Sequence, residues 1–156
     1  MKLSTAFKPD YERHEGVRPI IVLLLRLGYG LVFAFVGYTS WTRIINHQGD
    51  WDPIQAAALC MFASHSLLSL IGIFHPLKML PLVLFEISYK LIWLVTVAWP
   101  LWSAHRLAGS PAEGMTYAFL PVVVPIVFVP WPYVFRKYIW SQPGSLTPLG
   151  RRVDHR

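Results

Sequence analysis

Four long apolar segments, separated by short polar stretches, dominate the hydrophobic pattern of the chain. They cover residues 19–41, 53–75, 79–102 and 115–135. Each has about the 20 residues that an α-helix needs to cross the hydrocarbon core of a bilayer. The turn at residues 75–78 is so short that the second and third segments should be antiparallel neighbours. The pattern predicts an all-α membrane protein, an up-down-up-down bundle of four transmembrane helices.

Charge sets the expected orientation of this bundle. Residues 1–18 form a polar N-terminal segment and residues 136–156 a basic tail, and an even number of spans puts both on one side. The basic residues on that side are Lys2, Lys8, Arg13, Arg18, Lys78, Arg136, Lys137, Arg151, Arg152 and Arg156. The opposite loops hold only Arg43 and Arg106. Basic residues gather in cytoplasmic loops, so both termini are expected in the cytoplasm.

Composition agrees with a bilayer as the main partner. Hydrophobic residues make up 54% of the 156 positions and charged residues 14%, against about a quarter in soluble domains. The formal charge of +6, concentrated near the termini, favours anionic lipid at the basic tail over nucleic acid. The single cysteine, Cys60, excludes a disulfide within the chain, and we expect it to be a small buried hydrophobe.

Two of the segments carry unusual residues. In the first, Gly28, Gly30 and Gly37 offer small surfaces where another helix can approach closely. The fourth contains four prolines, which free backbone carbonyls and predict a kinked or broken helix. These prolines are Pro121, Pro125, Pro130 and Pro132.

Four ionisable side chains interrupt the apolar segments, where charge is costly and marks either a structural pair or a site. Glu86 and Lys90 lie one helical turn apart in the third segment. Counting about 1.5 Å of rise per residue places Arg26 and Glu86 at similar depths, roughly 10 Å from the cytoplasmic surface. His65 lies near the depth of Lys90. The equal depths predict an ion pair between Arg26 and Glu86.

This polar layer has two interpretations. In the first, the charges only fix which helix faces which. In the second, Arg26, Glu86, Lys90, His65 and Tyr89 form a ligand-binding or proton-handling site, whose excess positive charge suits an anion or a quinone carbonyl. Further polar side chains at this level are Tyr29, Ser64, Ser66, Ser69 and Ser88. No facing histidine accompanies His65, so we expect no haem. We also expect no metal site and no catalytic residue, and no cofactor unless the ligand is a quinone.

Short motifs carry a family resemblance. The run Leu25–Phe33 followed by Gly37 resembles the first helix of DoxX-like bacterial membrane proteins. The stretches Phe85–Trp93 and Val129–Val134 are similar to segments of small, poorly characterised bacterial four-helix proteins. The resemblance implies a bacterial inner-membrane location and a link to quinone or thiol redox systems. The chain has no cysteine pair for a thiol role.

Three functions remain open at this point. The leading hypothesis is a non-enzymatic membrane protein that binds a lipophilic or anionic ligand or serves as an accessory subunit. The first alternative is a DoxX-like redox component that uses quinone. The second is a proton-coupled transporter of small molecules, built as a dimer, with Glu86 as the coupling acid. A homodimer or a larger membrane complex fits each of them.

Overall fold

The computed structural model describes residues 10–11 and 15–140. Within them every regular element is a helix, apart from one β-bridge between Asp10 and Val17. Three helices, Pro19–Ile45, Pro53–Phe74 and Leu80–Ser103, are long and apolar enough to cross a membrane. Only 17% to 33% of the residues in their most apolar windows are buried inside the protein, so most of these side chains face outward, as lipid contact requires. The predicted all-helical class is confirmed, and these helices have the length and composition of membrane spans.

The long helices start as the sequence predicts. Each has a proline within its first two positions, where the missing N–H costs nothing. Asp52 also caps the second helix, since its Oδ1 accepts a hydrogen bond from the Gln55 N–H at 2.7 Å. Two of the helices widen into a π-helical turn midway. Their parts are α2 (Pro19–Leu31), η1 (Val32–Val36) and α3 (Gly37–Ile45), then α4 (Pro53–Phe74), then α5 (Leu80–Trp93), η2 (Leu94–Ala98) and α6 (Trp99–Ser103).

The fourth apolar segment is broken, as its prolines predict. It contains α7 (Glu113–Phe119), the 3₁₀ turn η3 (Leu120–Val122), α8 (Val123–Phe128), α9 (Trp131–Val134) and π-helical η4 (Phe135–Ile139). The backbone leaves the helical region at Val129 and Pro130, where ψ is 128° and 77°. The part that follows is bent by 74° from the part before it. The apolar segment at residues 115–135 is therefore not one continuous helix, and it counts as a span only if the two parts of the bent pair are taken together.

The break limits how far the fourth segment reaches. Glu113–Phe128 rises only about 24 Å at 1.5 Å per residue, short of a hydrocarbon core of about 30 Å. The described chain thus has three helices that meet the requirements of a span, and a fourth if the bent pair is counted as one. In addition, η4 runs through Ile139, so residues 136–139, which the sequence assigns to the tail, are helical.

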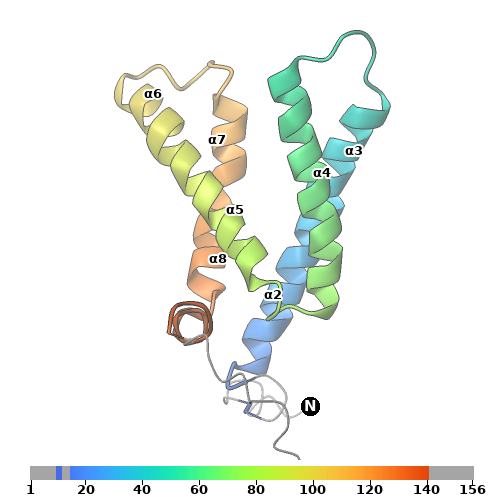
Figure 1. The fold of residues 1–156 in the computed structure, drawn as a ribbon. Helices are drawn as coiled ribbons and strands as arrows, with labels where there is room; N and C mark the ends of the chain where they lie inside the picture. The colour runs from blue at the N-terminus through green and yellow to red at the C-terminus, as the bar shows by residue number, and fades with distance from the viewer. Residues whose placement is uncertain (1–9, 12–14, 141–156) are drawn as a thin grey trace, which may run out of the picture.

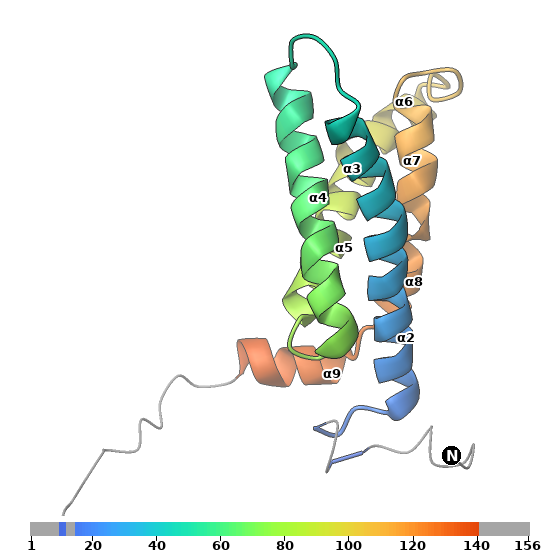
Figure 2. The same ribbon diagram turned by 90° about the vertical axis from the view of Figure 1, so that its right-hand side faces the viewer.

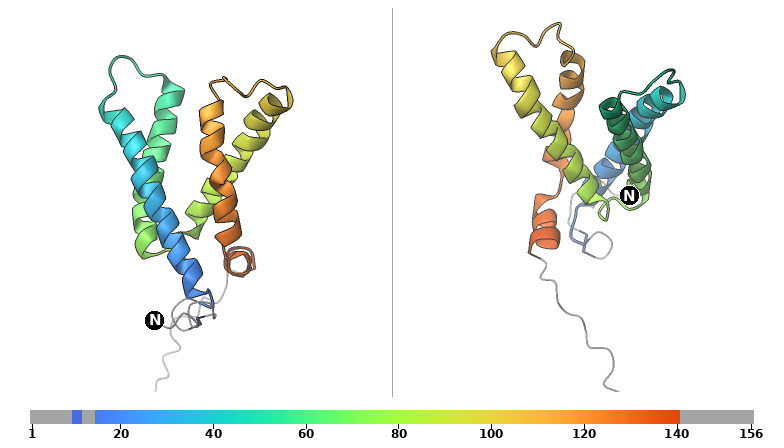
Figure 3. Two further views of the ribbon diagram at one scale, coloured as in Figure 1. Left: turned by 180° about the vertical axis from the view of Figure 1, so that it is seen from behind. Right: turned by 45° about the horizontal axis from the view of Figure 1, so that its top comes forward.

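The helices form two hairpins that diverge like the arms of a V (Figures 1 and 3). The first hairpin comprises α2 to α4 and the second α5 to α8. They are close at the narrow end, where α2 begins and α8 ends, and apart at the open end, which carries the loops of residues 46–52 and 104–112. Figure 2 shows α9 and η4 lying across the narrow end. The two hairpins therefore pack at the narrow end and splay apart at the open end (Figure 1).

The core lies at the narrow end. Buried side chains of α2, α5, η3 and α9 pack there, among them Leu80, which is fully buried. Tyr29 holds the first hairpin together: its ring lies so close to Gly72 that a Cβ atom there would be 2.6 Å from Tyr29 Cδ1. The Tyr29 hydroxyl donates to the Pro76 carbonyl at 3.1 Å. Gly37 packs on Ser66, whereas Gly28 and Gly30 have nothing within 4 Å of a built Cβ among the described residues, so no helix of this part of the chain approaches them closely.

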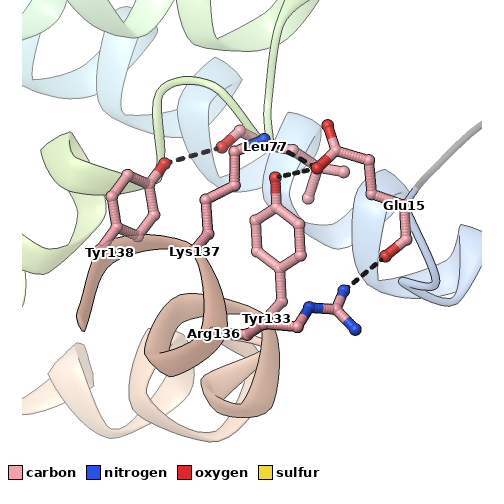
Figure 4. Close-up of polar contacts among 6 residues, drawn as sticks. All are labelled: Glu15, Leu77, Tyr133, Arg136, Lys137 and Tyr138. Carbon is pink, nitrogen blue, oxygen red and sulfur yellow. Dashed lines mark hydrogen bonds and ion pairs between the residues drawn. The ribbon is translucent and has the colours of Figure 1, made fainter. Parts of the chain in front are cut away.

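A polar clamp fixes α9 and η4 to the narrow end (Figure 4). The Glu15 carboxylate accepts hydrogen bonds from Lys137 Nζ at 2.7 Å and from the Tyr133 hydroxyl at 3.1 Å. Arg136 donates to the Glu15 carbonyl, and the Tyr138 hydroxyl donates to the Leu77 carbonyl. The hydrogen bond from Lys137 lowers the pKa of Glu15 below its ordinary 4.5. The remainder of the predicted N-terminal segment and tail, residues 1–9, 12–14 and 141–156, lies outside the described residues.

Candidate functional site

Glu86 lies at the centre of the intramembrane polar cluster. Its Oε1 is 2.5 Å from Lys90 Nζ, one turn further along α5. Its Oε2 is 3.7 Å from Nε2 of His65, which comes from α4 of the other hairpin. All three side chains are shielded, with exposed fractions of 12%, 15% and 5% for Glu86, Lys90 and His65. One carboxylate thus bridges a cation on its own helix and an imidazole across the hairpin boundary.

Arg26 does not join this cluster. It is exposed on α2, and among the ion pairs of the described residues Glu86 is shared only by Lys90 and His65. The buried face of α2 is formed by Val22, Leu25 and Tyr29. Arg26 lies about 100° from Leu25 but only about 40° from Val22 around the helix, so it is at the edge of that face, where it is exposed. The predicted pair of Arg26 and Glu86 is therefore wrong, because Arg26 is exposed and Glu86 is paired with Lys90 and His65 instead.

Tyr89 supplies an aromatic wall beside the cluster. Its ring contacts Phe62, His65, Phe85 and Phe119, with centroid separations between 5.5 and 6.5 Å. The Lys90 ammonium lies 5.8 Å from the centroid of the Phe119 ring, within reach of a cation–π attraction. Of the five candidate residues that the sequence proposes, the structure brings together His65, Glu86, Tyr89 and Lys90.

A cleft of about 570 Å³ lies between the two hairpins on the open side of this cluster. One wall comes from η1, α3 and α4, and the other from α5, α7 and the loop before it. Its lining residues are Val36, Thr39, Ser40, Arg43, Leu59, Phe62, Tyr89, Lys90, Pro111, Gly114, Met115, Ala118 and Phe119. Most of the wall is apolar, and its two cations come from different hairpins.

Sequence reasoning missed Arg43 as a site residue, because it placed Arg43 in the loop after a helix ending at residue 41. The helix continues to Ile45, so Arg43 lies on its last turn. A signal was present: Val36, Ser40 and Arg43 are spaced by four and three residues, which puts them on one helix face. That face lines the cleft.

A smaller groove of about 380 Å³ lies on the other side of the cluster, between α4 and α5. It is lined by Cys60, Met61, Ser64, His65, Leu68, Leu82 and Phe85. Cys60 is exposed there, so the expectation of a buried cysteine is wrong. His65 lines this lateral groove and Lys90 lines the cleft, with Glu86 between them. The three ionisable groups therefore separate two hollows.

Within residues 10–11 and 15–140, no group of three or more histidine, cysteine, aspartate or glutamate side chains is placed to hold a metal ion. Comparison with family models, with curated proteins and with solved structures returns no match for this chain. The resemblance to DoxX-like proteins therefore stays a prediction. The function has to be argued from the site itself.

Proposed function

We propose that this chain is an integral membrane protein that binds a lipophilic ligand in the cleft between its two hairpins. The cleft itself carries the proposal: about 570 Å³ is within the range of small-molecule sites. Like such sites it has mainly apolar walls with a few polar groups. Phe62, Met115 and Phe119 supply apolar contact area, and Lys90 supplies charge. The role is binding rather than catalysis.

The charge of the cleft indicates the kind of ligand. Lys90 and Arg43 are cations and Glu86 is an anion, so the site keeps an excess positive charge with His65 neutral. An anionic or electron-rich group, such as a carboxylate or a quinone carbonyl, lowers the electrostatic energy of such a site. A lipophilic body fits the aromatic and aliphatic walls. The ligand class that we propose combines the two.

The proposed placement has four crossings, with the fourth formed by Glu113–Phe128 together with the non-helical Val129 and Pro130 that follow, and with both termini in the cytoplasm. The basic residues near the termini support this orientation. The helix of α9 and η4 then lies along the inner membrane surface. Exposed Ile139 and Trp140 on it suit the boundary between headgroups and acyl chains, and Arg136 suits anionic headgroups. We propose the bacterial inner membrane as its location, on the strength of the resemblance.

Filling the cleft tests the proposal. Ala118 is exposed and lines the cleft, so Ala118→Trp should block it. Ala58 is exposed on α4 and lines none of the hollows described above, so Ala58→Trp is the matched control. The proteins are extracted in polymer-bounded lipid discs and the bound small molecules are identified by mass spectrometry.

We expect a molecule that is enriched with the wild type and with Ala58→Trp and is lost with Ala118→Trp. Equal lipid content in all three would refute ligand binding in the cleft. A quinone in the enriched fraction would support the redox alternative. A stoichiometric larger protein with no enriched molecule would support the accessory-subunit role.

The position of Glu86 between two hollows favours one further candidate, proton-coupled transport. A carboxylate that contacts Lys90 beside the cleft and His65 beside the lateral groove is placed to pass a proton between the two hollows. In proteoliposomes loaded with a pH-sensitive dye, the wild type should dissipate a pH gradient when the enriched ligand is added. Glu86→Gln should not. Equal rates for the two proteins would remove this candidate.

A further inference from the structure

A second, polar hollow of about 530 Å³ lies at the open end, next to the cleft. It is formed by the last turn of α3, the loop that follows and the first turns of α4. Its lining residues are Thr42, Arg43, Asn46, His47, Gln48, Trp51, Gln55 and Leu59. We call it the outer pocket. Unlike the cleft, it is lined mainly by groups that form hydrogen bonds.

The chemistry of this lining suits a polar anion. Asn46, Gln48 and Gln55 carry side-chain amides that can donate hydrogen bonds, and Arg43 carries a forked cation that matches carboxylate and phosphate oxygens. His47 is stacked on Trp51, with ring centroids 3.4 Å apart and planes inclined by 17°. Its enclosed Nε2 has no hydrogen-bond partner within the described part of the chain. A ligand group with several oxygens would find partners here.

The outer pocket and the cleft are adjacent, because Arg43 and Leu59 line both. Their charges differ in one respect. Lys90, in the cleft, is already neutralised by Glu86 at 2.5 Å. Arg43, on the shared rim, forms no ion pair or hydrogen bond with any residue in the described ranges. Asp50 and Asp52 belong to the same loop but line neither hollow, and the Asp52 carboxylate is used as the cap of α4.

We infer that the ligand is an amphiphile with an anionic, oxygen-rich head in the outer pocket and an apolar tail in the cleft. This rests on the proposed function and assigns a direction to its ligand. The head contacts Arg43 and the neighbouring amides, where positive charge is unbalanced. The tail runs between Phe62 and Phe119 towards the neutralised pair of Lys90 and Glu86. The class is a single-chain amphiphile with a phosphate or carboxylate head.

Three probes separate head from tail: dodecyl phosphate, dodecanol and inorganic phosphate. Each is titrated as a radiolabelled compound against the full chain in discs of neutral phosphatidylcholine, with empty discs subtracted. We expect the wild type to bind dodecyl phosphate most tightly, dodecanol on the order of 10-fold to 100-fold more weakly, and inorganic phosphate weakest. Dodecanol lacks the charged head and therefore loses a charged hydrogen bond. Inorganic phosphate lacks the apolar chain and therefore loses the contacts of the tail. Arg43→Gln should bind dodecyl phosphate and dodecanol alike, and Arg43→Lys should restore part of the difference.

The outcomes distinguish this inference from the proposed function. Ala118→Trp should weaken both long-chain probes, because it fills the tail site. If Lys90→Gln removes the preference for dodecyl phosphate and Arg43→Gln does not, the head lies beside Lys90 and Glu86. That result would overturn the proposed direction of the ligand but keep the cleft as its site. Tight binding of inorganic phosphate without help from a chain would indicate a free solute in the outer pocket and overturn the amphiphile. If no long-chain probe binds the wild type above the empty discs, both the inference and the proposed function fail.

Discussion

Glu86→Gln should destabilise the protein through the loss of its partners on both hairpins. At 2.5 Å, and with an effective dielectric constant of about 20, the attraction between Glu86 and Lys90 amounts to roughly 6–7 kcal/mol before the cost of desolvation is subtracted. Desolvation of the two groups cancels much of this attraction, but removing one partner leaves the other shielded and unpaired. We expect a loss of about 2–4 kcal/mol in the free energy of unfolding.

A double-mutant cycle isolates the pair. Lys90→Met keeps the length of the side chain and removes its charge, and the double variant leaves neither charge unpaired. The double variant should lose less than the sum of the two single losses, with a coupling energy of about 1–3 kcal/mol. Arg26→Gln is the matched control, because Arg26 is exposed and lies outside the cluster. Its effect should be small and should add to that of Glu86→Gln.

Unfolding in mixed micelles, with the mole fraction of sodium dodecyl sulfate increased stepwise, gives the free energies. Tryptophan fluorescence follows the transition, and equal slopes among the variants show that the unfolded states are comparable. Strictly additive effects of Glu86→Gln and Lys90→Met would refute the pair. A coupling between Arg26 and Glu86 of more than about 0.5 kcal/mol would show that Arg26 belongs to the cluster after all.

Three further predictions concern the frame around the site. Gly72→Ala should destabilise the first hairpin by about 1–3 kcal/mol in the same unfolding assay, because the added methyl group meets the Tyr29 ring; no loss would show that the helices separate freely there. The lowered pKa of Glu15 means that its clamp contributes stability above the unfolded value near pH 4.5, and that this contribution is lost as the pH falls through the lower folded value. The protection factors of the η4 amides, which are exchange rates corrected for the pH dependence of intrinsic exchange, should therefore fall in acid in the wild type and depend little on pH in Glu15→Gln; identical profiles of protection against pH would contradict the clamp. Reporter fusions at Gly49 and Ser110 should indicate the outer side of the membrane, and a cytoplasmic signal from either would reverse the proposed orientation.

The contacts of Glu86 agree with both interpretations of the polar layer. His65 and Glu86 come from different hairpins, so their contact helps to hold the arms of the V together, as a structural pair would. Lys90 also lines the cleft, and a pair that only fixed the fold would not need to face a hollow. The cluster of His65, Glu86 and Lys90 thus both joins the two hairpins and contributes a side chain to the lining of the cleft.

The sequence by itself determined the positions of residues along the helices. Hydrophobic length predicted the long helices, the prolines predicted a kink or break in the fourth segment, and the spacing of four residues predicted the contact of Glu86 with Lys90. Depth counting also placed His65 near Lys90, and the two meet Glu86 together. These features depend on the rise per residue and on local backbone chemistry, which the sequence specifies directly.

Only the tertiary structure decided rotation about the helix axes, the separation of the helices and the direction after the break. A membrane-spanning helix is apolar on nearly all sides, because lipid and protein neighbours are equally apolar, so the hydrophobic pattern does not identify the face that packs. For this reason Arg26 is exposed and unpaired with Glu86, while Arg43 lines a cleft whose existence the spacing of Val36, Ser40 and Arg43 alone does not reveal. The cleft exists because the two hairpins pack at one end and diverge at the other, and that geometry arises from contacts such as those of Tyr29 and Leu80, far from the cleft itself.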